Sequence, residues 1–128
     1  MGLRILVVDD EECIRESIKI YFEDKGYDVV TLDHPSQCDG LDNRMCHGQD
    51  ECAEVLIIDQ WMPGMTGIEY LARRHDWGCR STGQRKALMS ANLPDGLRAQ
   101  AIELGCVIFD KPVLLAQIEN WLCEGIST

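Results

Sequence analysis

The stretch "IIDQWMPGMTG", Ile57–Gly67, decides how this chain folds. An apolar run ends on a single carboxylate, Asp59, and the chain then turns through Met-Pro-Gly before a second glycine. Pro63 presets its own φ angle, while Gly64 and Gly67 tolerate unusual ones, so the segment predicts a buried strand followed by a sharp turn. A strand that finishes on an aspartate indicates a functional carboxylate at the edge of a sheet.

Apolar runs alternate with helical patterns on both sides of this stretch. Five runs predict strands: "LRILVV" (3–8), "YDVVTL" (27–32), "EVLIID" (54–59), "KALMSA" (86–91) and "CVIFDKP" (106–112). Apolar residues at helical spacing predict helices after four of them: Ile14, Ile18, Tyr21 and Phe22; Ile68, Leu71 and Ala72; Leu97, Ala101 and Leu104 after Pro94; and Leu114, Leu115, Ile118 and Leu122. A further helix is expected within 34–53, where Gly40 and Gly48 make it short or irregular. The alternation predicts an α/β fold with a parallel sheet covered on both faces.

Composition narrows the class of protein. The 128 residues suggest one domain, and the formal charge of −10 disfavours binding to nucleic acid, whose phosphates would be repelled. No apolar run is long enough to span a membrane, and the acidic N-terminal segment does not resemble a signal peptide, so we expect no membrane association and a cytoplasmic location. The seven cysteines are then expected to be reduced thiols.

Polar side chains follow four of the predicted strands. Strand one ends in Asp9-Asp10, strand three in Asp59, strand four in Ser90 and strand five in Lys111. Because parallel strands end at one edge of a sheet, these side chains should meet there. Three carboxylates at close range repel one another, and oxygen ligands suit Mg²⁺ or Mn²⁺. A nucleophilic carboxylate, a metal, a cation and a hydroxyl together are what phosphoryl transfer to an aspartate requires.

These segments resemble the receiver domain of two-component response regulators, the CheY-like superfamily. "ILVVDDE" resembles the opening strand of that family with its acidic pair, and "LIIDQWMPGMTGIEYL" its phosphoacceptor segment. "ALMSA" resembles the family's Ser/Thr-Ala strand end, and "DKP" its Lys-Pro signature. The resemblance implies a doubly wound, flavodoxin-like five-stranded parallel sheet in the order 2-1-3-4-5, with residues 1–128 forming a single receiver domain without an output domain.

The resemblance also implies roles for the strand-end residues. Asp59 would accept the phosphoryl group, and Ser90 and Lys111 would bind it. Mg²⁺ would be held by Asp10, Asp59 and the backbone carbonyl of Trp61, with Asp9 acting through water. The phosphoryl donor would be a sensor histidine kinase or a phosphotransfer protein. Phosphorylation would shift the surface formed by the helix after Pro94, strand five and the last helix, in a monomer or a phosphorylation-dependent dimer that acts on a downstream protein or output domain.

Two departures from the family pattern concern aromatic residues. Receiver domains often carry an aromatic residue three positions before the lysine, where this chain has Ile108, and Phe109 lies one residue nearer. Two readings of Phe109 therefore stay open: an aromatic rotamer switch or a core residue. Trp61 lies two residues after Asp59, and we hypothesise that it restricts water and prolongs the life of an aspartyl phosphate. The alternative is that its side chain points outward without a role.

The cysteines raise a separate question. Cys13 and Cys123 are predicted to be structural helix residues, whereas Cys46, Cys52, Cys79 and Cys106 come before or at the start of strands. Cys46, His47, Cys52 and Cys79 could approach one another at the edge of the sheet opposite the aspartates and bind Zn²⁺. Because no Cys-x-x-Cys pair is present, we favour unlinked thiols over a zinc site or a disulfide.

Three other functions compete with that of a signalling domain switched by phosphorylation of Asp59. An aspartate-nucleophile phosphatase of the haloacid dehalogenase type carries a second aspartate two residues after the nucleophile, where this chain has Trp61. A flavodoxin-like FMN carrier needs a hydroxyl- and glycine-rich loop after strand one, where this chain is acidic. A receiver that acts only as a non-phosphorylated scaffold would not need all five site residues. The sequence therefore favours a phosphoacceptor signalling domain rather than an enzyme that turns over an external substrate.

Overall fold

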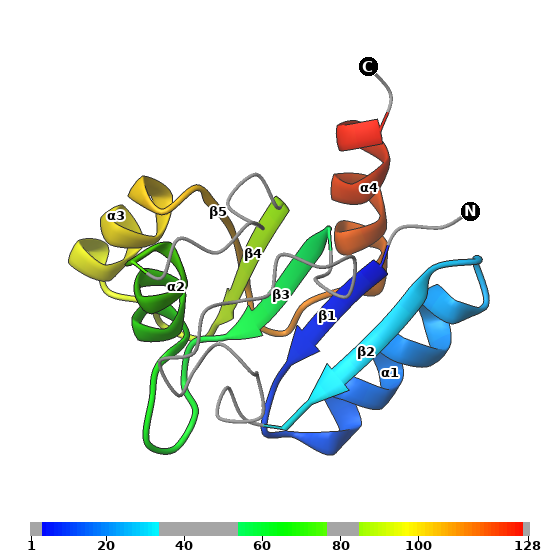
Figure 1. Cartoon of the computed structure of the whole chain (residues 1–128), viewed down its shortest axis with the longest axis horizontal. Coiled ribbons are helices and arrows are strands. Elements are labelled where there is room, and N and C mark those ends of the chain that lie inside the picture. The colour runs from blue at the N-terminus through cyan, green and yellow to red at the C-terminus, as the bar shows by residue number, and fades with distance from the viewer. Residues whose placement is uncertain (1–3, 34–53, 77–84, 127–128) are drawn as a thin grey trace.

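Five parallel strands form one sheet in the order β2-β1-β3-β4-β5, which confirms the predicted fold class (Figure 1). The computed structural model describes residues 4–33, 54–76 and 85–126. The strands are β1 Arg4–Val8, β2 Asp28–Leu32, β3 Val55–Asp59, β4 Arg85–Ser90 and β5 Cys106–Asp110. The helices in these ranges are α1 Glu12–Glu23, α2 Gly67–Asp76, α3 Asp95–Glu103 and α4 Leu115–Ile126. The helix expected within 34–53 lies outside the described residues.

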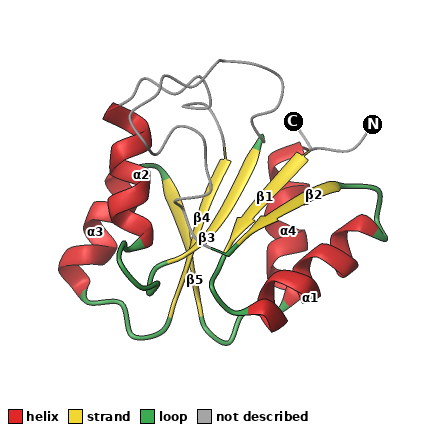
Figure 2. Ribbon diagram, turned by 60° about the horizontal axis from the view of Figure 1, so that its bottom comes forward, coloured by secondary structure: helices red, strands yellow, loops and turns green. Residues whose placement is uncertain are grey.

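Helices cover both faces of the sheet, with α1 and α4 on one face and α2 and α3 on the other (Figure 2). All five residues of the central strand β3 are buried, which explains why its sequence is apolar at every position instead of alternating. The α1–α4 face packs around Phe22 and Ile118, and the α2–α3 face packs around Tyr70 and Leu88. The sheet is therefore the middle layer of three.

Helix α1 directs Ile14, Ile18 and Phe22 toward the sheet, since residues four apart lie on one side of a helix. The chain leaves the helix through Gly26, whose φ of +95° favours glycine. The bounds of each strand agree with those of its predicted apolar run to within one or two residues at either end. We find no helix in the described ranges with the length and apolar character needed to span a membrane.

The start of α4 differs from the prediction. Leu114 lies just before the helix and is 64% exposed, so it does not belong to the apolar face that Leu115, Ile118 and Leu122 form. The side-chain oxygen of Gln117 accepts a hydrogen bond from the Leu114 backbone N–H (3.0 Å), and the Gln117 N–H returns one to the Leu114 carbonyl (2.9 Å). This reciprocal cap begins the helix one residue later than apolar spacing suggested.

Two polar clamps hold α4 in place. The Tyr21 hydroxyl on α1 donates a 2.6 Å hydrogen bond to Glu119 Oε1 on α4, and the ammonium of Lys25 lies 3.4 Å from Glu119 Oε2. At the other clamp, the guanidinium of Arg85 on β4 stacks over the Trp121 ring and donates to the backbone carbonyls of Trp121 and Leu122. These contacts join α4 to both α1 and the sheet.

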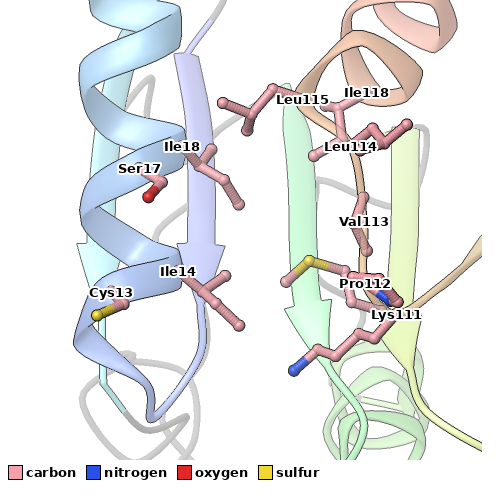
Figure 3. A pocket seen from close by; sticks show the side chains of 11 residues that line it. Cys13, Ile14, Ser17, Ile18, Lys111, Pro112, Val113, Leu114, Leu115 and Ile118 are labelled. Atoms are coloured by element: carbon pink, nitrogen blue, oxygen red, sulfur yellow. The ribbon is translucent and has the colours of Figure 1, made fainter.

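A pocket of about 500 Å³ lies between α1 and the segment that runs from Lys111 into α4 (Figure 3). Ile14 and Ile18 of α1 line one wall, and Val113 and Leu115 line the other. The pocket is mostly apolar, and Lys111 stands at its end nearest the strand termini.

Candidate functional site

The carboxyl ends of the strands bring the polar residues of the sequence to one edge of the sheet. Asp9 follows β1, Asp59 ends β3, Ser90 ends β4 and Lys111 follows β5. Strand register places Asp59 opposite Met89, so that Ser90 lies one residue further along the neighbouring strand. One carboxylate oxygen from each of Asp9, Asp10 and Asp59 lies within 4.8 Å of the other two. The three acidic residues therefore form one cluster.

Lys111 pairs with two members of this cluster and with the neighbouring Glu11. Its ammonium nitrogen is 2.9 Å from Asp59 Oδ1, 3.6 Å from Asp9 Oδ2 and 3.4 Å from Glu11 Oε1. Burial by itself would lower the pKa of Lys111, but the hydrogen bond to Asp59 and the charges of Asp9 and Asp59 outweigh it, and the pKa is raised. Lys111 is therefore a fixed positive charge against the Asp59 carboxylate.

Asp9 is fully buried and only partly satisfied. Its Oδ1 accepts a 2.9 Å hydrogen bond from the Glu11 backbone N–H, and its backbone carbonyl accepts one from Arg15 Nη1 (2.9 Å). Its Oδ2 is buried without a hydrogen-bond partner. Burial and, to a smaller extent, the negative charge of Asp59 raise the pKa of Asp9 to about 6, against the lowering effects of the Glu11 N–H and of Lys111.

Asp59 is buried at the end of β3. Burial raises its pKa, and the hydrogen bond and charge of Lys111 oppose this effect without cancelling it. The backbone N–H of Trp61 also acts to lower the pKa of Asp59. Asp59 thus meets one cation and one backbone donor, while its neighbours Asp9 and Asp10 add repulsion.

The turn after Asp59 is braced by the buried side chain of Gln60. Its Oε1 accepts a 3.0 Å hydrogen bond from the Ile68 N–H at the start of α2, and its backbone carbonyl accepts one from Gly67 (3.0 Å). A Cβ on Gly67 would approach the Asp59 carbonyl oxygen to 2.7 Å, so only glycine fits there. Gly64 has a φ of +82°, which agrees with the sharp turn expected from the sequence.

Trp61 reaches from this turn to the loop that follows β4. Its indole Nε1–H donates a 3.0 Å hydrogen bond to the Ala91 carbonyl, although the side chain is 46% exposed. The buried Ser90 hydroxyl donates a longer, 3.3 Å hydrogen bond to the same carbonyl. The Trp61 side chain therefore has a defined contact beside the site instead of pointing freely outward.

The acidic cluster fits a divalent cation. Three carboxylates converge within 4.8 Å, and the buried Asp9 Oδ2 has no hydrogen-bond donor. A cation would relieve both the mutual repulsion and this unsatisfied oxygen, and an all-oxygen ligand set suits Mg²⁺ or Mn²⁺.

The other residues singled out in the sequence do not belong to the acidic cluster. Phe109 packs into the core between the sheet and α4, with its ring 5.8 Å from that of Trp121, and Ile108 packs on the opposite face. Phe109 is thus a core residue. Cys13 and Cys123 are exposed helix residues and Cys106 is buried, and all three are free thiols. The group of Cys46, His47, Cys52 and Cys79, for which the sequence favours unlinked thiols over a zinc site or a disulfide, lies outside the described residues.

Three contacts near the site were not anticipated from the sequence. They are the ion pair of Glu11 with Lys111, the hydrogen bond from Arg15 to the Asp9 carbonyl, and the hydrogen bond that the Gln60 side chain accepts from the Ile68 N–H. Only the role of Gln60 could have been found from the sequence, because a polar side chain directly after a buried strand needs an internal hydrogen-bond partner. Glu11 belongs to the acidic run, and Arg15 lies one helical turn further on.

Comparison with known proteins identifies the family. A sequence model of the response regulator receiver domain matches residues 5–122, and the chain belongs to this family. It is 34% identical to the two-component response regulator ORR6 of Oryza sativa subsp. japonica over 125 residues, which are 97% of this chain and 71% of that protein. It is 28% identical to the transcriptional regulatory protein ResD of Bacillus subtilis over 106 residues, which are 80% of this chain and 38% of ResD.

Solved structures agree on the fold. The chemotaxis protein CheY4 of Vibrio cholerae has a TM-score of 0.77 at 22% identity, with 97% of this chain and 98% of that chain covered. A response regulator receiver protein of Pseudomonas putida has a TM-score of 0.80 at 21% identity, with 97% and 98% covered. Among sequence relatives, the match spans only 38%, 29% and 26% of the lengths of ResD and of the Pseudomonas aeruginosa proteins PhoB and AruR.

Proposed function

We propose that this receiver domain is a phosphorylation switch in which Asp59 is the phosphoacceptor. One observation carries the proposal: Lys111 lies 2.9 Å from Asp59, beside two further carboxylates and an unsatisfied buried oxygen of Asp9. This arrangement positions a nucleophilic oxygen and surrounds it with groups that can neutralise the charge of a phosphoryl group.

In the proposed reaction a carboxylate oxygen of Asp59 attacks the phosphorus of a phosphohistidine. The new O–P bond forms as the P–N bond breaks, and the imidazole nitrogen leaves with the electron pair and takes up a proton from solvent. Lys111 then pairs with a phosphoryl oxygen, and the Ser90 hydroxyl turns from the Ala91 carbonyl to donate to another. Each group acts by position and charge, which is the main contribution that proteins make to phosphoryl transfer.

Asp10, Asp59 and the Trp61 carbonyl would hold the divalent cation, with Asp9 acting through water. A bound Mg²⁺ or Mn²⁺ supplies charge neutralisation for the incoming phosphoryl oxygens. The side chains of this chain keep the site ready for it, because Arg15 and the Glu11 N–H fix Asp9 at the end of β1.

The partners follow from the family. The donor is a histidine kinase or phosphotransfer protein, and the apolar pocket beside Lys111 offers it a contact surface. The α3-β5-α4 surface carries the response to a downstream protein or output domain, with or without dimerisation. Residues 1–128 then act as one receiver domain, and the cytoplasmic location stays a prediction.

Two alternative functions would require a different set of residues at the site. A scaffold receiver would not need Lys111 and three carboxylates in contact range of one another. An aspartate-nucleophile phosphatase would need an acid/base two residues after Asp59, and the Trp61 side chain at that position has no titrating group.

The test is the intact mass of the protein after incubation with acetyl phosphate and Mg²⁺. We expect a single phosphoryl adduct in the native protein and none in Asp59→Asn or in the presence of EDTA. Asp110→Asn is the matched control, because Asp110 also ends a strand but pairs with Arg98 on the surface, and it should keep the adduct. A folded native protein that forms no adduct, or an Asp59→Asn variant that still forms one, would refute the proposal.

A further inference from the structure

Trp61 lies two residues after the candidate phosphoacceptor and also reaches the neighbouring loop. Its backbone N–H lowers the pKa of the Asp59 carboxyl group, and its indole N–H donates to the Ala91 carbonyl at 3.0 Å. One residue therefore joins the group that would be modified to the segment that leads into α3. Any displacement of the Asp59 carboxylate can reach Ala91 through this single side chain.

The loop after β4 leaves the sheet at Ala91. The last sheet contact is the 2.9 Å hydrogen bond from the Lys111 N–H to the Ser90 carbonyl. The next residue, Ala91, is held through its carbonyl by the Trp61 indole and the Ser90 hydroxyl. Asn92 then adopts a φ of +58°, which turns the chain toward Pro94 and α3. The position of this loop thus depends on two side-chain donors that both lie beside Asp59.

The aromatic residue near Lys111 does not provide an equivalent link. Phe109 lies in the core against Trp121 on the α4 face of the sheet, and Ile108 occupies the opposite face, where α3 packs. A rotamer change of Phe109 would have to displace core residues, which close packing opposes.

We propose that Trp61 is a positioning residue that transmits the state of Asp59 to the β4–α3 loop through its hydrogen bond to Ala91. The inference rests on the proposed function. When Asp59 carries a phosphoryl group, the carboxylate beside Trp61 changes in charge and bulk, and the Ser90 hydroxyl turns toward the phosphoryl oxygen. The Ala91 carbonyl then keeps only the Trp61 indole as its side-chain donor. A shift of Trp61 therefore displaces the β4–α3 loop in the same direction.

The test compares amide hydrogen exchange in residues 91–104 with and without acetyl phosphate and Mg²⁺, in native protein, Trp61→Phe and Trp61→Leu. Both substitutions remove the indole N–H, and both are tolerable at a side chain that is 46% exposed. In native protein we expect phosphorylation to change exchange in this segment by roughly fivefold, as one hydrogen bond typically does to a local opening equilibrium. Exchange is compared for the fraction of each sample that carries the adduct, and in both variants the change should fall to less than about half of the native one.

Trp121→Phe is the matched control, since it removes an indole from the Phe109 contact and leaves Trp61 in place. It should keep the native response. A full response in the two Trp61 variants, or a loss confined to Trp121→Phe, would overturn the inference and leave the proposed function standing. The adduct mass of the same samples distinguishes failure of this inference from failure of the proposed function. A native protein that forms no adduct overturns the proposed function and this inference with it.

Discussion

Replacing Asp9 with asparagine should make the metal-free protein more stable. Asp9 is fully buried, its Oδ2 lacks a hydrogen-bond partner, and its pKa is raised to about 6. Asparagine has nearly the same shape and no charge. Its carbonyl oxygen can keep the hydrogen bond from the Glu11 N–H, so the substitution removes the cost of burying a charge with little loss of packing.

The size of the effect follows from the pKa. A rise from 3.8 to about 6 means that ionising Asp9 costs the folded protein about 3 kcal/mol relative to the unfolded chain. The folded state binds the proton more tightly, so this cost is fully present above pH 6 and declines as the pH falls toward 4. This cost already includes the attraction to Lys111. Since the asparagine NH2 would face the Lys111 ammonium, which lies 3.6 Å from Asp9 Oδ2, we expect a net gain of about 2 kcal/mol at pH 7.5 and about half of it at pH 5.

Urea unfolding followed by circular dichroism measures this difference, first in EDTA and then with Mg²⁺. The native protein should gain about 1.4 kcal/mol when Mg²⁺ is at roughly ten times its dissociation constant, and Asp9→Asn should gain less. Asp10→Asn is the control, because Asp10 is exposed: its stability in EDTA should change by under about 0.5 kcal/mol, while its response to Mg²⁺ should weaken.

An Asp9→Asn protein that is no more stable than the native one in EDTA at pH 7.5 would refute the argument that the ionised Asp9 is a cost. A stability gain that stays constant between pH 7.5 and pH 5 would contradict it as well, since the gain must then come from something other than the charge.

Three further outcomes test other parts of the structure. Gly67→Ala should destabilise the protein by about 1–3 kcal/mol in urea unfolding, because its Cβ would lie 2.7 Å from a backbone oxygen, whereas Gly96→Ala in open space on α3 should stabilise it by about 0.5–1 kcal/mol. Burial raises the pKa of the Cys106 thiol to about 11, so peptide mapping after iodoacetamide treatment at pH 8 should find it far less alkylated than the exposed Cys13. Phe109→Leu should lower stability by about 1–2 kcal/mol without changing the yield of phosphoryl adduct, and a loss of adduct in folded protein would assign Phe109 a role at the site.

The fold and the convergence at the site could be predicted because both depend on strand order and strand ends. β3 is apolar at every position because both of its faces are covered, and this property is visible in the sequence. Once the strands are parallel, Asp9, Asp59 and Lys111 must lie at one edge, whatever the rotamers of their side chains.

The remaining contacts depend on rotamers and on local hydrogen bonds that no periodicity records. The indole of Trp61 could have turned either way, and only the loop geometry brings it to Ala91. The face chosen by Phe109 depends on the register of β5, since a shift of one residue reverses every side chain of a strand. The start of α4 was set by a cap from Gln117, which outweighed the apolar spacing that included Leu114.

The polar clamps on α4 have a mechanical consequence. Glu119 is tied to α1 through Tyr21, and the Trp121 ring and carbonyl are tied to β4 through Arg85. These contacts join α1, α4 and β4 so that they resist shear as one unit. A displacement of the β4–α3 loop would therefore move that loop relative to α4 and change the surface that the two present together.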